Sequence, residues 1–273
     1  MLVNTATVRR ASRPRDYVGV SGPDAAGYLQ RMVSNDVTGL GVGDACDALL
    51  LTAKARVIAP LRVLRRGEDD FLLLTEPGLG ERVRRELLRS RFASRVEVEP
   101  ELHTSVVVFG EGITGIPNPD YGERAVEVLD DDPGGEELSP EELELLRIRA
   151  KTPMFGREID DRVLPAEAGL DETHISFTKG CYPGQEPVAR LHHRGHANRG
   201  LRLLEVAAEE PPAPETDVRF GERAVGRITS AVRDGDGRVY ALAYVRVEVP
   251  HDAELLVGNA AARSLDSVSS SAD

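Results

Sequence analysis

Most of the side chains that could do chemistry in this sequence lie in one short stretch. In order, its residues are Lys179-Gly180-Cys181-Tyr182-Pro183-Gly184-Gln185-Glu186, with Arg190 one helical turn later. A thiol follows an amine by two residues, and an amide, an acid and a guanidinium come next at helical spacing. Glycines on both sides of the Cys-Tyr-Pro sequence permit a sharp turn that brings the backbone close to a ligand. Because residues 175–178 have the pattern of a short strand, we predict a strand, a turn and a helix that form a site.

Two residues of this stretch are candidates for catalysis. Cys181 could act as a thiolate, favoured by Lys179 and by the N-terminus of the helix that follows. The alternative for Cys181 is a small buried hydrophobic residue, the common fate of a free cysteine. Lys179 could stabilise that thiolate or an anionic group of a ligand, or it could be an ordinary exposed lysine. No histidine lies near Cys181 in the sequence, so a cysteine–histidine enzyme would need the fold to supply one.

Four further residues of the stretch, together with Asp36, are candidates for ligand binding. Tyr182 could stack on a flat ligand or simply pack in the interior. Gln185 and Glu186 could contact the ligand or cap the helix. Arg190 could bind a ligand carboxylate, or it could pair with Glu186 at i,i+4 spacing. Asp36 follows a predicted helix at 25–33 and could contact the ligand or close the turn, since aspartate readily ends a helix.

A histidine-rich segment follows the predicted site. It contains His192, His193 and His196 and lies in the most basic part of the chain, residues 191–201. The spacing suggests a metal site, but no acid or cysteine completes a ligand set, so we predict no metal. The segment could border an anionic ligand or act as a solvated hinge, and the sequence leaves both open.

The octapeptide resembles the K-G-C-Y-x-G-Q-E signature of the YgfZ/GcvT-like folate-binding proteins. These are relatives of the glycine-cleavage aminomethyltransferase that bind tetrahydrofolate and support tRNA thiolation and iron–sulfur enzymes. Other segments are similar to family motifs: residues 165–170 to P-x-E-A-G-L, residues 22–38 to G-x-D-A-x-x-[FY]-L-Q and [TS]-N-D-V, and residues 53–56 to A-K-G-[KR]. Ala55 stands where that hairpin usually has glycine. Arg149 and Lys151 also depart from a family stretch I-E-A-G-x-P.

The resemblance implies a fold, a ligand and partners. It implies an α+β fold, with an aminomethyltransferase-like folate-binding core and a C-terminal antiparallel β-barrel. The ligand would be tetrahydrofolate or a derivative, with Cys181 and Lys179 facing its reactive part. Glu167 would meet the pterin, since a carboxylate can accept two parallel N–H bonds from a 2-amino-4-oxo-pyrimidine edge; the alternative is a surface carboxylate. Candidate protein partners are iron–sulfur or tRNA-modifying enzymes.

One departure from the family bears on the reaction. In the aminomethyltransferase branch, the strand after the hairpin carries an aspartate beside the reactive nitrogens of the folate. The matching residues are Ala59 and Pro60, and neither can act as a base. We therefore predict a tetrahydrofolate-binding accessory protein of the YgfZ type. The alternatives are a glycine-cleavage-type aminomethyltransferase and a non-catalytic scaffold, so enzymatic activity stays open.

The composition points to an acidic protein of the cytoplasm. The 273 residues carry 34 basic and 46 acidic side chains, a formal net charge of −12. This charge disfavours non-specific adhesion to nucleic acid or anionic membrane, although a local basic patch remains compatible with it. The two cysteines, Cys46 and Cys181, form no disulfide or zinc pattern. The first residues lack a signal-peptide hydrophobic region. We expect neither direct nucleic-acid binding nor membrane association.

The order of the predicted elements indicates an α+β protein of two units. Residues 48–75 have the pattern of a β-meander, and a helix at 80–90 follows with its arginines outward. A further helix is predicted from Ser139, with Ser at the N-cap, Pro at N1 and Glu142 completing a capping box. We assign residues 1–200 to the folate-binding core, of two interleaved subdomains in which 46–102 form a ferredoxin-like layer. Residues 201–263 would form the barrel and 264–273 a disordered tail.

Overall fold

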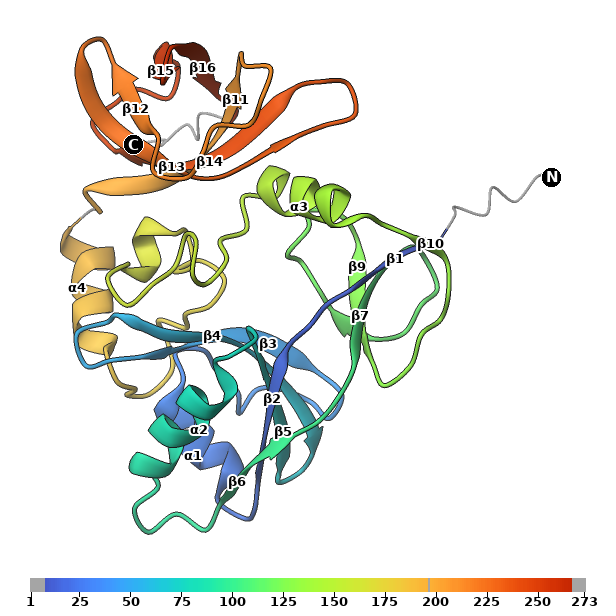
Figure 1. The fold of residues 1–273 in the computed structure, drawn as a ribbon. Coiled ribbons are helices and arrows are strands. Elements are labelled where there is room, and N and C mark those ends of the chain that lie inside the picture. Colours follow the sequence, from blue (N-terminus) through green and yellow to red (C-terminus); the bar gives the residue numbers. More distant parts are fainter. Residues whose placement is uncertain (1–7, 196, 267–273) are drawn as a thin grey trace.

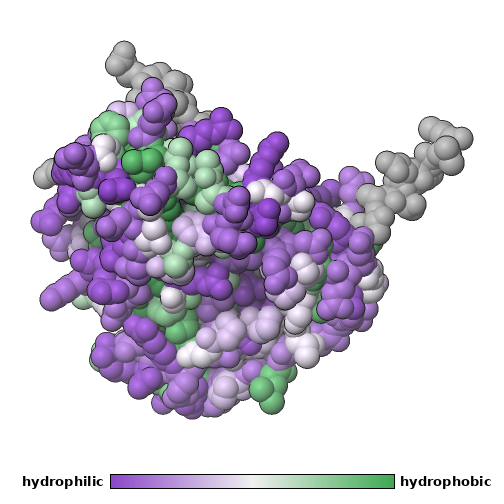
Figure 2. All heavy atoms as spheres, turned by 45° about the horizontal axis from the view of Figure 1, so that its top comes forward, coloured by the Kyte–Doolittle hydropathy of each residue, from purple (hydrophilic) through white to green (hydrophobic). Residues whose placement is uncertain are grey.

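The computed structural model of the protein describes residues 8–195 and 197–266 (Figure 1). Three units surround a central region: a sheet covered by two helices, a second smaller sheet with one helix, and a closed barrel. The loop-rich segment 150–184 lies between them and contributes a hydrophobic cluster with both the first sheet and the barrel. On the face seen in Figure 2, hydrophilic residues cover most of the surface and hydrophobic ones are scattered.

The first sheet is antiparallel, with strand order β3-β4-β5-β2-β6. Its strands are β2 (Asp16–Ser21), β3 (Ala45–Leu51), β4 (Val57–Gly67), β5 (Asp70–Thr75) and β6 (Glu97–Glu101). Helices α1 (Ala25–Met32) and α2 (Gly80–Arg89) pack on one face, where Tyr28, Leu29 and Leu87 are fully buried. The first sheet thus spans residues 16 to 101, because β2 lies between β5 and β6; the range 46–102 that we predicted for a ferredoxin-like layer omits β2.

The second sheet has the order β10-β1-β7-β9-β8. Its strands are β1 (Arg9–Ser12), β7 (Ser105–Phe109), β8 (Ile116–Pro117), β9 (Ala125–Leu129) and β10 (Glu136–Glu137). From β1 in this sheet the chain passes through the first sheet from β2 to β6 and returns with β7. Helix α3 (Pro140–Arg149) follows, and its predicted capping box is confirmed: Ser139 Oγ accepts from Glu142 N, and the Glu142 carboxylate accepts from Ser139 N.

The C-terminal unit is a closed antiparallel barrel of strand order β11-β14-β13-β12-β15-β16. The strands are β11 (Arg199–Val206), β12 (Asp217–Phe220), β13 (Arg223–Arg233), β14 (Val239–Arg246), β15 (Leu255–Val257) and β16 (Ala260–Ser264). Helix α3 packs against β13 and β14. Closure leaves no free sheet edge in this small unit. The last strand ends at Ser264, and Asp266 pairs with Lys151; residues 267–273 of the predicted tail lie outside the described residues.

The predicted strand at 175–178 is wrong. Residues 175–180 form bends and extended backbone between the short helix η1 (Pro165–Glu167) and helix α4 (Gln185–Arg194). Ser176 N donates to Ser34 O, a single bond to the segment after α1 rather than a ladder. A tertiary contact has therefore taken the place of strand pairing. Among the described helices, none combines the length and the apolar character that crossing a membrane requires.

Candidate functional site

The loop before α4 and the first turns of that helix form a surface depression of about 460 Å³, which we call the Cys181 depression. Cys181 is exposed in it. Five of the predicted site residues line the depression together: Cys181, Tyr182, Gln185, Glu186 and Arg190. Ala53 lines its other side, from the hairpin that joins β3 to β4. The structure thus places the thiol, the amide, the acid and the guanidinium around one opening to solvent.

Gly184 fits the start of α4 against the β3–β4 hairpin. Its φ angle is 85°, in the left-handed region that glycine adopts without strain. A Cβ on this residue would lie 2.6 Å from Thr52 O and 3.1 Å from the Cα of Ala55. Ala55 itself has a φ of 57°, at the position where the family resemblance predicts glycine. Ala55 therefore adopts the left-handed backbone that glycine favours, although it carries a Cβ.

The side chain of Lys179 lies in the interior and not at the thiol. It is 9% exposed, and its Nζ donates to the carbonyl oxygens of Val33 and Asn35, both at 2.6 Å. Burial lowers the pKa of this amine to about 8, although nearby Asp36 and Cys46 act in the opposite direction. Lys179 does not line the Cys181 depression. The expectation that Lys179 stabilises a Cys181 thiolate is therefore not met by this structure.

The buried position of Lys179 gives a direct titration test. The chain has three lysines, Lys54, Lys151 and Lys179, so ¹³Cε NMR signals of lysine are few enough to assign with a Lys179→Arg variant. We expect the Lys179 signal to titrate near pH 8 in the folded protein, and near the ordinary lysine value of about 10.4 once the protein is unfolded in urea. Because the folded pKa is the lower one, stability should rise with pH between these two values. A Lys179 signal that titrates near the ordinary value in the folded protein would contradict the buried amine.

The other two predicted acids have protein partners. Asp36 Oδ1 accepts from Gln30, from the amide and hydroxyl of Thr38 and from Gly39 N. The hydroxyl bond from Thr38 is the largest cause that lowers the pKa of Asp36. Asp36 therefore closes the turn after α1, which is the alternative to a ligand contact. Glu167 accepts two bonds from Arg199, each at 3.2 Å, and one from Leu164 N. Its carboxylate therefore joins η1 to the first barrel strand.

The predicted groups in and just before helix α4 differ in how open they are to a ligand. Tyr182 is buried against the hydrophobic cluster between sheet and barrel, where burial raises its pKa to about 12. Arg190 is exposed, and no described carboxylate lies within 4 Å of it, so the intrahelical pair with Glu186 is not formed. His192 stacks on Phe177 with ring centroids 3.9 Å apart. In residues 8–195 and 197–266 no group of three His, Cys, Asp or Glu side chains could hold a metal, and His196 is not described.

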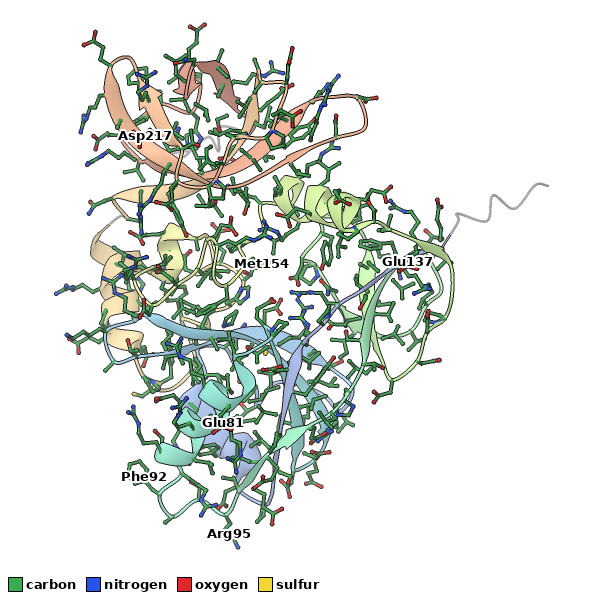
Figure 3. All side chains as sticks on the ribbon, viewed as in Figure 1. Glu81, Phe92, Arg95, Glu137, Met154 and Asp217 are labelled. Atoms are coloured by element: carbon green, nitrogen blue, oxygen red, sulfur yellow. The ribbon has the colours of Figure 1, made fainter. Side chains whose placement is uncertain are left out.

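A second, more interior cavity lies at the centre of the molecule. Its volume is about 290 Å³, and it is lined by β3 and β4 of the first sheet, by the loop residues at 13, 15, 76 and 119–121, by Arg147 of α3 and by the segment 150–174. Figure 3 marks Met154, one of the lining residues, in this central region. The ionisable residues of the wall are Arg13, Arg15, Asp47, Arg62, Glu76, Asp120, Tyr121, Arg147, Lys151 and His174. Of the predicted site residues, none lines this central cavity.

One guanidinium organises the acids of the cavity wall. Arg62 on β4 donates to Asp47 at 2.8 Å, to Asp120 at 3.0 Å and to Glu127 at 3.3 Å. Arg15 donates to Glu127 at 2.6 and 2.9 Å. Burial opposes the charge on Asp120 and Glu127, but the arginines outweigh it and hold both pKa values below the ordinary range. The wall is therefore a rigid, charge-compensated network.

His174 adds a neutral group to this wall. Its Nδ1 lies 2.8 Å from the Thr173 hydroxyl, and burial lowers its pKa, with Asp47 and Asp120 acting against the shift. A neutral imidazole can accept or donate one hydrogen bond at pH 7. Our sequence analysis missed His174 and the arginine network. The available signal was Asp47, the charged residue of the otherwise apolar strand β3, and Arg62, the charged residue within the apolar run 57–64 of β4.

The chain is similar over most of its length to proteins called tRNA-modifying protein YgfZ. The protein from Yersinia pestis is 25% identical, covering 88% of this chain and 84% of the relative. That from Edwardsiella ictaluri is 28% identical, covering 88% and 85%. No protein-family model matches the chain.

Among solved structures, the glycine cleavage system aminomethyltransferase T of Bartonella henselae matches 96% of this chain and 86% of its own, with a TM-score of 0.82 at 19% identity. This likeness confirms the predicted α+β fold with its C-terminal barrel. It shows the fold alone, because one fold can host different functions. Together with the sequence similarity, it supports the YgfZ/GcvT-like resemblance at modest identity.

Proposed function

We propose that this protein is a tetrahydrofolate-binding accessory protein of the YgfZ type, which supports tRNA modification and the maintenance of iron–sulfur enzymes in the cytoplasm. The observation that carries the proposal is the central cavity within an aminomethyltransferase-like fold. Its volume of about 290 Å³ is close to the lower limit of small-molecule sites, roughly 300 Å³. Iron–sulfur or tRNA-modifying enzymes are the partners we propose.

The cavity contains side chains of the types that can hydrogen-bond a folate. The carboxylates of Asp47 and Asp120 can accept N–H bonds from a pterin edge while they remain paired with Arg62. Arg13 also lines the cavity, where its two terminal guanidinium nitrogens donate to Glu76, while its buried Nε has no hydrogen-bond partner among the described residues. When bound, a tetrahydrofolate would supply one-carbon chemistry. The protein's part would be to orient the pterin against the ion-paired wall and to keep water from it.

The geometry disfavours direct aminomethyl transfer. Pro60 lines the cavity at the position where the transferase branch has aspartate, and Ala59 is buried. The cavity carboxylates Asp47 and Asp120 are held by Arg62, and a carboxylate whose pKa is lowered, as that of Asp120 is, makes a weak base. The Cys181 depression shares no lining residue with the central cavity. We therefore assign folate recognition to the cavity, and a thiol-dependent or partner-binding step to the depression.

Titration of the purified protein with tetrahydrofolate and 5-formyl-tetrahydrofolate tests the proposal. Met154→Trp should fill part of the cavity and weaken binding about tenfold or more, whereas Met154→Leu, of similar volume, should bind nearly as the parent does. Cys181→Ala should bind normally. Saturable binding that is lost in Cys181→Ala and kept in Met154→Trp would move the ligand to the depression. No binding of the parent near 1 mM, only about −4 kcal/mol of affinity, would refute the folate assignment and leave the scaffold alternative.

A further inference from the structure

The Cys181 depression is one end of a longer surface groove. A hollow of about 360 Å³ beside α2 shares Ala53 with the depression. A third hollow, of about 810 Å³, shares Met32, Ser90 and Pro183 with the second and ends at Phe92. We call this continuous surface, from Arg190 past Pro183 to Phe92, the basic groove. It shares no lining residue with the central cavity, so inferences about it are independent of folate binding.

The groove is basic although the protein is acidic. Residues 79–95, which form α2 and the loop after it, contain six arginines and two glutamates, a local charge of 6 − 2 = +4 against −12 for the whole chain. Arg82 and Arg89 line the middle hollow, and Arg85 lies on the same helical face at i+3 and i−4 from them. Arg31 and Arg190 line the two ends.

Many of these arginines form no ion pair with a described carboxylate. The acids of the groove wall include Asp24 and Glu86, which pair with Arg95 at 3.2 Å and with Arg89 at 2.9 Å. Glu186 is the remaining acid of the lining. Within the described part of the chain, no carboxylate lies within 4 Å of the guanidinium groups of Arg31, Arg82, Arg85, Arg91 and Arg190. Such groups are available to an anionic ligand.

An exposed aromatic ring stands at the far end of the groove. The side chain of Phe92 is 91% exposed, in a loop where its own φ is 45°. Figure 3 shows Phe92 projecting outward below α2, on the same side of the molecule as Arg95. Nothing described covers the ring, so the fold gains no buried area from it. Unpaired arginines along a groove with an exposed aromatic side chain are the combination that binds single-stranded nucleic acid.

We propose that the basic groove binds a single-stranded RNA segment, with the arginines on its phosphates and Phe92 stacked on a base. The negative net charge of the chain led us to expect no nucleic-acid binding, but net charge reports the sum and not its distribution. An acidic protein segment could satisfy the arginines, yet it would leave Phe92 without a stacking partner. This difference favours RNA and gives the test its contrast.

Fluorescence anisotropy with a labelled single-stranded RNA oligonucleotide of mixed sequence, titrated with the full-length protein at low salt, tests the proposal. The groove variant combines Arg31→Gln, Arg85→Gln and Arg190→Gln. The matched variant makes the same charge change on the barrel, at the exposed residues Arg223, Arg227 and Arg263. We expect the groove variant to bind about tenfold more weakly or worse and to lower the salt slope by about 2. The barrel variant should bind nearly as the parent does.

Phe92→Ala separates stacking from charge. It should weaken RNA binding about fivefold or more without changing the salt slope, since it removes no charge. In thermal melts, the midpoints of both arginine variants should lie close to that of the parent, because substitutions of exposed residues usually change stability little. If the groove and barrel variants lose RNA affinity equally, the net charge of the protein alone explains the binding, and the proposal is overturned. Absence of saturable RNA binding by the parent would also overturn the proposal. Displacement of the RNA by polyglutamate at equal charge concentration would show that the groove binds an acidic protein segment instead.

Discussion

Gly184→Ala is expected to destabilise the protein by about 3 kcal/mol, while Gly180→Ala should change stability by less than about 1 kcal/mol. At residue 184 the substitution forces a left-handed backbone on alanine, which costs about 1–2 kcal/mol. It also places a Cβ 2.6 Å from Thr52 O, so the hairpin must move, and such overpacking typically costs a further 1–3 kcal/mol. Gly180 has no heavy atom within 4 Å of an added Cβ.

Urea unfolding of the two variants beside the parent protein measures the difference. Both substitutions remove one glycine from the same loop, so the change in unfolded-chain entropy is nearly the same and cancels in the comparison. Because the hairpin supplies Ala53 to the Cys181 depression, Gly184→Ala should also change the rate at which Cys181 reacts with a thiol reagent. Equal midpoints for the two variants would show that Gly184 does not hold α4 against the hairpin.

Glu127→Ala is expected to cost about 3–5 kcal/mol, the range for breaking a buried ion pair by removing one partner. Glu127 is fully buried and accepts from Arg15, Arg62, Ser105 and Asn118. Its loss would leave the guanidinium of Arg15, 6% exposed, without its closest carboxylate. The matched control is Glu248→Ala, which breaks an ion pair whose carboxylate side chain is 52% exposed. That change should cost less than about 1 kcal/mol.

The ion-pair network of Glu127, Asp120 and their arginines should also make the stability of the protein depend on pH. The pKa values of Glu127 and Asp120 are depressed in the folded state. Their stabilisation is therefore fully present above the unfolded values, about 4, and is lost as pH falls through the lower folded values. The stability difference between the parent and Glu127→Ala should accordingly be constant from pH 7 to 5 and should shrink below about pH 4. A difference that stays constant down to pH 3 would show that Glu127 acts by packing and not by charge.

The interior networks also explain how the units are held around the cavity. Arg147 on α3 donates to Glu158 at 3.0 Å and to Ser230 Oγ at 2.9 Å, so one side chain reaches from the helix to the barrel. Tyr244 on β14 donates its hydroxyl proton to Glu158 O. These bonds link residues far apart in sequence. They fix segment 150–174, which carries much of the cavity wall, against a rigid barrel.

The local features of this protein could be predicted from its sequence. The capping box at Ser139 and Glu142, the helix at 80–90 and the strands of the meander follow from short-range hydrogen bonding and hydrophobic periodicity, which neighbouring residues specify. The resemblance carried by residues 179–186 predicted the fold class, which the structure confirms. The five candidate residues of this stretch lie in one depression, because a glycine-containing turn and the first turns of a helix bring them together without contacts from distant elements.

The tertiary structure alone decided which groups share a site. Lys179, two residues from Cys181, turns inward to the carbonyl groups of Val33 and Asn35, and Glu167 binds Arg199 from the barrel. The cavity wall joins Arg13, Asp47, Asp120 and His174 from four separate segments. Such pairings arise because buried charges need partners from whatever element packs against them, wherever it lies in the chain. Spacing along the chain does not encode that packing.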